Sequence, residues 1–159
     1  MVPKTALLMA IPILLGTSRS ANGQSADPGP GARTACDSLA AWLGNVPAAD
    51  VERIALDTIQ DVRADRAMAA CTLHVSGAWR EVEGAPDPLA LIDRLDKWLG
   101  ERGWRADPRL TADGAGSGSQ GFRRDGLLCI RYAAWGDVPD HEDFLESYQV
   151  RISCADAAR

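Results

Sequence analysis

Hydrophobic residues recur between positions 88 and 102 at spacings of three and four, the period of a helix that buries one face. The apolar members of this stripe are Leu91, Ile92, Leu95, Trp98 and Leu99. Asp87 is suited to cap the N-terminus, Pro88 fits the first helical position, and Gly103 can end the helix in a left-handed conformation. The pattern therefore predicts a helix over Pro88–Arg102.

A shorter helix is predicted over Cys36–Leu43, where Leu39, Trp42 and Leu43 fall on one side. The stretch 51–62 fits two patterns. Ile54, Leu56, Thr58 and Val62 alternate as in a strand, whereas Val51, Ile54, Ala55, Ile59 and Val62 recur as in a helix. Its β-branched content favours the strand.

Alternation with a period of two predicts three clearer strands. They cover Ala70–Trp79, Leu127–Trp135 and Ser147–Cys154. Gly121–Arg124 enters a further strand, because the Asp125–Gly126 dipeptide after it is typical of a two-residue hairpin turn. These strands are expected to pair in an antiparallel sheet.

The expected order of elements is α-β-β-α-β-β-β, which indicates an α+β fold with one long helix packed on a face of an antiparallel sheet. Residues 112–121 are rich in glycine and serine and are predicted to form a loop. The glycine-rich part, Gly114–Gly121, lacks the Gly-Lys-Ser/Thr ending of a phosphate-binding loop, so no nucleotide site is predicted there.

The N-terminus has the pattern of a secretory signal peptide, in which Lys4 precedes the ten uncharged residues Ala6–Leu15 and small residues follow. Ten residues are too few for a membrane span, which needs roughly 20. We expect a signal peptide over 1–23, a disordered segment over 24–35, and a single globular domain over 36–159. The alternative is an uncleaved anchor at the membrane interface.

Composition narrows the class of partner. Cleavage after Gly23 would remove Lys4 and Arg19 and no acidic residue, so the net charge would change from −5 to −7. An acidic surface argues against nucleic acid as a partner, which requires a positive footprint.

Two of the 17 basic residues are lysines and the other 15 are arginines. That bias, together with abundant alanine, indicates a bacterial protein from a high-GC genome.

The four cysteines are Cys36, Cys71, Cys129 and Cys154, and none is in a CxxC pair. In an exported chain an even number of cysteines indicates disulfides, with three possible pairings. Joining segments expected to be neighbours predicts Cys36–Cys71 and Cys129–Cys154. A four-cysteine zinc site is the alternative, but its ligands usually come in close pairs. No metal or cofactor is therefore predicted.

Candidate binding residues fall at strand ends and in one acidic segment. Trp79 and Trp135 lie near the ends of predicted strands, where an indole can anchor a partner or a glycan. The acidic segment contains Asp137, Asp140, His141, Glu142 and Asp143. Its oxygens suit a hard cation such as Ca²⁺, but the order does not match the EF-hand loop. Carboxylates in the first turn of a short helix explain the segment equally well.

Catalytic patterns are weak. His74 and Ser76 are expected on the same, solvent-facing side of their strand, but the sequence offers no acidic partner and no G-x-S-x-G turn. We therefore expect a periplasmic or secreted, non-catalytic binding module of a bacterial cell envelope, whose partner is an envelope or extracellular protein. An inhibitor of a basic partner is one form of this function. The alternative is a small hydrolase or metal-dependent enzyme that uses residues 137–143.

Overall fold

The computed structural model describes residues 27–62, 65–78, 83–84, 87–114, 116–135 and 147–157. The elements follow one another as α1 (Pro30–Leu43), β1 (Asp50–Asp61), β2 (Arg66–Ala78), α2 (Pro88–Glu101), β3 (Arg105–Gly114), β4 (Ser117–Arg124), β5 (Leu127–Trp135) and β6 (Ser147–Asp156). The predicted class, α+β with an antiparallel sheet, is confirmed.

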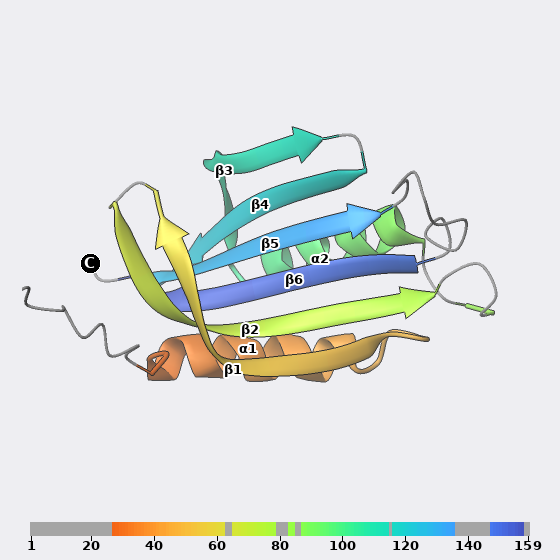
Figure 1. Ribbon diagram of the computed structural model, residues 1–159, viewed down its shortest axis with the longest axis horizontal. Helices are drawn as coiled ribbons and strands as arrows, with labels where there is room; N and C mark the ends of the chain where they lie inside the picture. The colour runs from red at the N-terminus through yellow and green to blue at the C-terminus, as the bar shows by residue number, and fades with distance from the viewer. Residues whose placement is uncertain are drawn as a thin grey trace, which may run out of the picture.

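The six strands form one sheet in the order β1-β2-β6-β5-β4-β3, and every neighbouring pair is antiparallel. Both helices pack on the same side of it, and no helix of the described residues lies on the other side (Figure 1). We call that other side the helix-free face. The prediction that one long helix alone covers a face of the sheet is wrong, because α1 packs on the same side and is as long as α2, with 14 residues each. Within the described ranges, neither helix has the length and apolar content needed to cross a membrane.

Helix α1 begins at Pro30, six residues before the predicted start at Cys36. The N-cap residue Gly29 has no side chain to cap the helix. Instead, the carboxylate of Asp156 on β6 accepts a hydrogen bond from the backbone N–H of Ala32 at 2.9 Å. This contact satisfies one of the free N–H groups at the helix end and places a negative charge near the positive end of the dipole. Residues 30–35, which were expected to be disordered, are therefore helical.

The ambiguous stretch 51–62 is a strand up to Asp61, as its β-branched content favoured. Its alternation is interrupted because the register with β2 shifts between Ile54 and Asp57. An extra residue of this kind reverses the side-chain alternation beyond it. The prediction of a loop over 112–121 is wrong, because residues 112–114 end β3 and residues 117–121 begin β4. Strand β3 as a whole was not predicted, so the sheet has one strand more than expected.

The main core lies between the sheet and the two helices. The side chains in it with almost no exposure include Leu39 and Leu43 from α1, Leu91, Leu95 and Leu99 from α2, and Leu73, Val75, Tyr148, Val150 and Ile152 from the sheet. The Cys36–Cys71 disulfide joins α1 to β2, and the Cys129–Cys154 disulfide joins β5 to β6. Both predicted pairings are confirmed.

A partly buried ion pair also connects α2 to the sheet. The guanidinium of Arg131 on β5 donates to both carboxylate oxygens of Asp96, at 3.1 and 3.2 Å. Arg131 is 6% exposed, so Asp96 neutralises a charge that has almost no access to water. Burial raises the pKa of Asp96 even though the attraction of Arg131 opposes that rise.

The sheet curls at the end where β1 finishes and β2 begins, and this end of the two strands bends across the helix-free face (Figure 1). A second apolar cluster fills this end; its members are Ile59, Met68, Ala70, Leu128, Ala155 and Ala157, with Leu110 and Ile130 packed against them. Three strands separate β1 from β4 in the sheet, yet Arg123 of β4 reaches Asp61 of β1 at 3.1 Å. The same guanidinium contacts Asp107 of β3 at 2.8 Å. The curl therefore makes this end of the helix-free face concave.

Candidate functional site: the helix-free face of the sheet

Five of the six binding residues predicted from the sequence lie outside the described residues: Trp79, Asp137, Asp140, His141 and Asp143. The sixth, Trp135, is the last residue of β5. It is half-buried and its ring packs against the main core on the helix side. The structure does not bring Trp135 to the helix-free face. The proposed use of residues 137–143 by an enzyme stays a prediction.

His74 and Ser76 are both exposed, and their neighbours Leu73 and Val75 are buried in the main core. The prediction that the two polar residues share the side opposite the core is confirmed. The pairing register then shows which residues of other strands join them. This information was not available from the sequence, because it depends on strands that are far apart in the chain.

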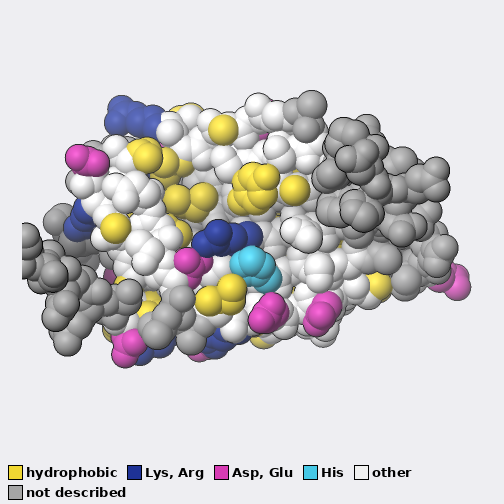
Figure 2. All heavy atoms as spheres, viewed as in Figure 1, with side chains coloured by type: hydrophobic (Ala, Val, Ile, Leu, Met, Phe, Trp, Pro, Cys, Tyr) yellow, Lys and Arg dark blue, Asp and Glu magenta, His cyan; other side chains and the backbone are white. Residues whose placement is uncertain are grey.

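One row of cross-strand neighbours crosses the middle of the helix-free face. Glu52 of β1 pairs with His74 of β2, His74 pairs with Arg151 of β6, and Arg151 pairs with Tyr132 of β5. We call these four residues the polar row. Figure 2 shows this face, with the histidine side chain close to basic, acidic and hydrophobic side chains near the middle.

The next row along the same strands contains Asp50, Ser76 and Gln149. Together with the polar row it lines a hollow of about 340 Å³. Tyr132 is 48% exposed here. An aromatic ring beside carboxylate, amide, hydroxyl and imidazole groups is an arrangement that can bind a polar ligand or a protein side chain.

A hydrogen-bonded network supports the polar row at the position where β1 changes register. Asp57 accepts hydrogen bonds from the hydroxyl of Thr72 at 2.6 Å, from the backbone N–H of Thr58 at 2.7 Å, and from Arg151. The hydroxyls of Thr72 and Ser153 are 2.7 Å apart. A hydroxyl has a single proton. Since Thr72 donates its proton to the carboxylate, Ser153 must donate to Thr72.

This network fixes the charge of Asp57. Burial alone would raise its pKa, but the hydrogen bonds from Thr72, Thr58 and Arg151 outweigh burial, and the pKa is lowered. Asp57 is therefore ionised at neutral pH and forms an ion pair with Arg151. The guanidinium is in this way held at the border of the hollow, and its positive charge is balanced.

The remaining charge of the hollow is negative. Its other acidic side chains are Asp50 and Glu52, which are both exposed. Among the described residues neither of them forms an ion pair. The hollow therefore presents two carboxylates to solvent and suits a ligand that contains a positive charge.

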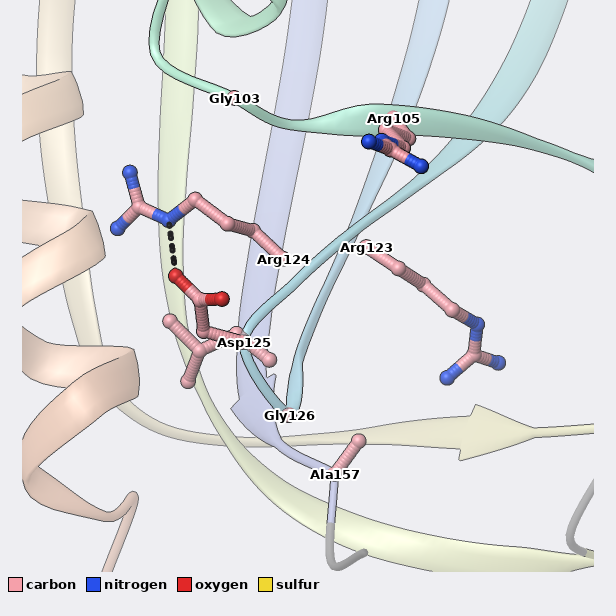
Figure 3. Close-up of a pocket in the computed structure, with 8 residues that line it drawn as sticks. Gly103, Arg105, Arg123, Arg124, Asp125, Gly126 and Ala157 are labelled. Carbon is pink, nitrogen blue, oxygen red and sulfur yellow. Dashed lines mark ion pairs between the residues drawn. The ribbon is translucent and has the colours of Figure 1, made fainter.

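A second hollow, of about 420 Å³, lies beside the turn between β4 and β5 and is lined by Arg105, Arg123 and Arg124. Three arginines in its lining suggest an anion site, but two of them are already engaged. Arg123 binds two buried carboxylates, and Arg124 stacks over Trp104 at 4.7 Å and pairs with Asp125 at 3.8 Å. The side chains of Arg123 and Arg124 also extend in opposite directions (Figure 3). These guanidiniums do not converge on one point.

All four cysteines are in disulfides, so none offers a thiol for catalysis. Within the described ranges, no group of three or more His, Cys, Asp or Glu residues is arranged to hold a metal ion. Comparison of this chain with protein-family models, with curated proteins and with solved structures found no match.

Sequence reasoning did not identify Tyr132, Arg151 and Asp57 as candidates. One signal was available: in the stretch 147–154 the polar residues alternate as regularly as the apolar ones. The apolar half identified the core, and the polar half, which includes Gln149 and Arg151, marks the helix-free face. The position of Asp57 gave no such signal, because it depends on the register shift in β1.

Proposed function

We propose that this chain is an exported, non-catalytic binding module of a bacterial cell envelope, and that its partner contacts the hollow on the helix-free face. The observation that carries the proposal is the half-exposed ring of Tyr132, which ends the polar row on the one side of the sheet that no described helix covers. Aromatic residues in such positions are enriched at the centres of protein interfaces.

Two further features support the proposal. The disulfides join α1 to the sheet and β5 to β6, which suits a protein that must persist in an oxidising compartment. The full chain has a net charge of −5, which would speed its encounter with a basic partner. An inhibitor of a basic envelope protein is therefore one form that the function takes in this proposal.

The test is capture of partners from envelope extract with three forms of the protein: the wild type, Tyr132→Ser and Leu89→Ser. Leu89 is 54% exposed on α2, on the helix side, so it matches the 48% exposure of Tyr132 and serves as the control. We expect a protein that the wild type and Leu89→Ser retain and that Tyr132→Ser loses. Equal retention by both variants would move the partner away from the helix-free face, and no retention by any form would contradict the binding function.

A further inference from the structure

Strand β1 forms one edge of the sheet, and within the described ranges no strand pairs with its outer side (Figure 1). The part of the strand from Asp50 to Ile54 pairs regularly with β2. It contains no proline, and its register is continuous. An edge of this kind offers a row of backbone N–H and C=O groups with which another strand can pair.

The opposite edge of the sheet differs in this respect. Strand β3 contains Pro108, which has no N–H to donate, and its register with β4 shifts between Asp107 and Ala112. Proline and irregular register are the features by which proteins prevent pairing at a sheet edge. Of the two edges, β1 has the longer regular stretch, and among the described residues no strand pairs with its outer side.

The side chains of β1 determine which strand fits there. Asp50 and Glu52 are two residues apart and both lie on the helix-free face, opposite Ser76 and His74 of the hollow. A strand added beside β1 would place alternate side chains directly opposite these two carboxylates. Opposite charges in such cross-strand positions are favourable, and like charges are unfavourable.

We propose that β1 binds an extended, basic segment of a partner protein by strand addition, with lysine or arginine at alternate positions opposite Asp50 and Glu52. This inference rests on the proposed function and names the class of partner. The long basic side chains would lie beside the hollow, where two carboxylates that form no ion pair with any described residue complement their charge.

The same charges disfavour a second copy of this chain as the occupant. Two β1 strands paired in antiparallel fashion about Glu52 would place one glutamate against the other. Two like charges in direct cross-strand contact are destabilising. The acidic edge therefore acts against self-association and selects for a basic segment.

The test uses synthetic peptides and the mature chain, with backbone amide shifts followed by NMR. The first peptide has lysine at alternate positions among threonine and valine. The second has the same composition with its lysines grouped, so that they cannot all lie on one face. The third repeats the first with N-methyl groups on the backbone amides that would face β1, which removes the donors needed for strand addition.

We expect the first peptide to bind and to shift the amides of β1, and the other two to bind far more weakly. Asp50→Asn and Glu52→Gln should each weaken binding of the first peptide by about 1.5- to 5-fold, the range of a cross-strand charge pair. Glu101→Gln is the matched control, because it removes the same charge from an exposed position of α2 and should leave affinity unchanged. Added salt should weaken binding.

Equal affinity for the N-methylated peptide, equal affinity for the grouped-lysine peptide, or amide shifts confined to β3 would each overturn the inference. Dimerisation of the wild type that Glu52→Gln strengthens without any peptide would support the role of the acidic edge. If no peptide binds but an envelope partner is still lost in Tyr132→Ser, strand addition at β1 is wrong and the proposed binding function stands.

Discussion

Replacing Thr72 by valine tests whether the network around Asp57 stabilises the curled sheet. Thr72 is fully buried, and valine has nearly the same shape without the hydroxyl. The change removes the 2.6 Å hydrogen bond to the Asp57 carboxylate and leaves the Ser153 hydroxyl without its acceptor. A hydrogen bond to a charged group contributes about 1.5 to 3 kcal/mol. We therefore expect the free energy of unfolding at neutral pH to fall by about 2 kcal/mol.

The dependence on pH gives the sharper measurement. The folded structure lowers the pKa of Asp57, so its contribution to stability is present above the pKa of an unfolded aspartate, about 3.9, and is lost as the pH falls through the folded pKa. Without the Thr72 hydroxyl, the folded pKa should rise toward the ordinary value. The gap in stability between wild type and Thr72→Val should therefore be widest near neutral pH and should narrow in acid.

Urea unfolding at several pH values measures both effects. With a slope of about 1.5 kcal/mol/M, the midpoint of Thr72→Val should lie roughly 1.3 M below that of the wild type at neutral pH. Thr58→Val is the control, because Thr58 is exposed and donates to Asp57 only through its backbone N–H, which valine keeps. It should change stability by no more than about 0.5 kcal/mol. Equal costs for the two variants, or a gap that is the same in acid, would refute the reasoning.

Three further predictions concern the attachment of the helices to the sheet. Asp96→Ala should destabilise the protein by about 3 kcal/mol, because it leaves the buried guanidinium of Arg131 unpaired. The measurement is thermal unfolding of this variant and of the double variant Asp96→Ala, Arg131→Met. A double variant as unstable as the single one would contradict the prediction. Asp156→Ala should lower the free energy of unfolding by about 1 kcal/mol, because α1 loses its cap, and the helical circular dichroism signal should fall before global unfolding. An unchanged midpoint of thermal unfolding would contradict this, because it would show that water replaces the carboxylate. Replacing both Cys36 and Cys71 by alanine should lower the free energy of unfolding by about 3 to 4 kcal/mol, because that disulfide spans 35 residues and restricts the unfolded chain. A loss below about 1 kcal/mol in urea unfolding would contradict this account.

The elements that could be predicted from the sequence are those whose caps and turns are formed by residues within or next to the element. In α2 the side chain of Asp87 accepts from the backbone N–H of Ala90 at 2.9 Å, as expected of an N-cap. Gly103 has a positive φ of 81°, as a left-handed helix end requires. The hairpin turn has positive φ at both Asp125 and Gly126, which suits the primed turn that this dipeptide favours.

The missed elements depend on contacts between distant parts of the chain. Gly121 lies within β4 although glycine usually indicates a loop. A Cβ there would come within 2.5 Å of the Cβ of Leu110, so only glycine allows β3 to pack across this position. The early start of α1 depends on Asp156, which is 124 residues away from the N–H that it caps. No local pattern contains either contact.

Strand β3 shows a different limit. Most of its residues are exposed, since it lies at the edge of the sheet and has little core beneath it. Without an alternating apolar set, the sequence has no periodic signal for a strand there. The candidate site was hidden for a related reason: the polar row brings together residues of four strands, and the neighbours in that row are set by register alone.

Packing in the two apolar clusters does not explain the residues in the middle of the helix-free face. The main core lies on the other side of the sheet, and the second cluster fills only the curled end. Tyr132 belongs to neither cluster, so its replacement by serine should cost the folded chain little. A partner that covers the ring would gain the burial of a large aromatic surface. A stabilising role and a binding role therefore differ in what Tyr132→Ser changes: the first lowers the midpoint of unfolding, and the second lowers only the affinity for a partner.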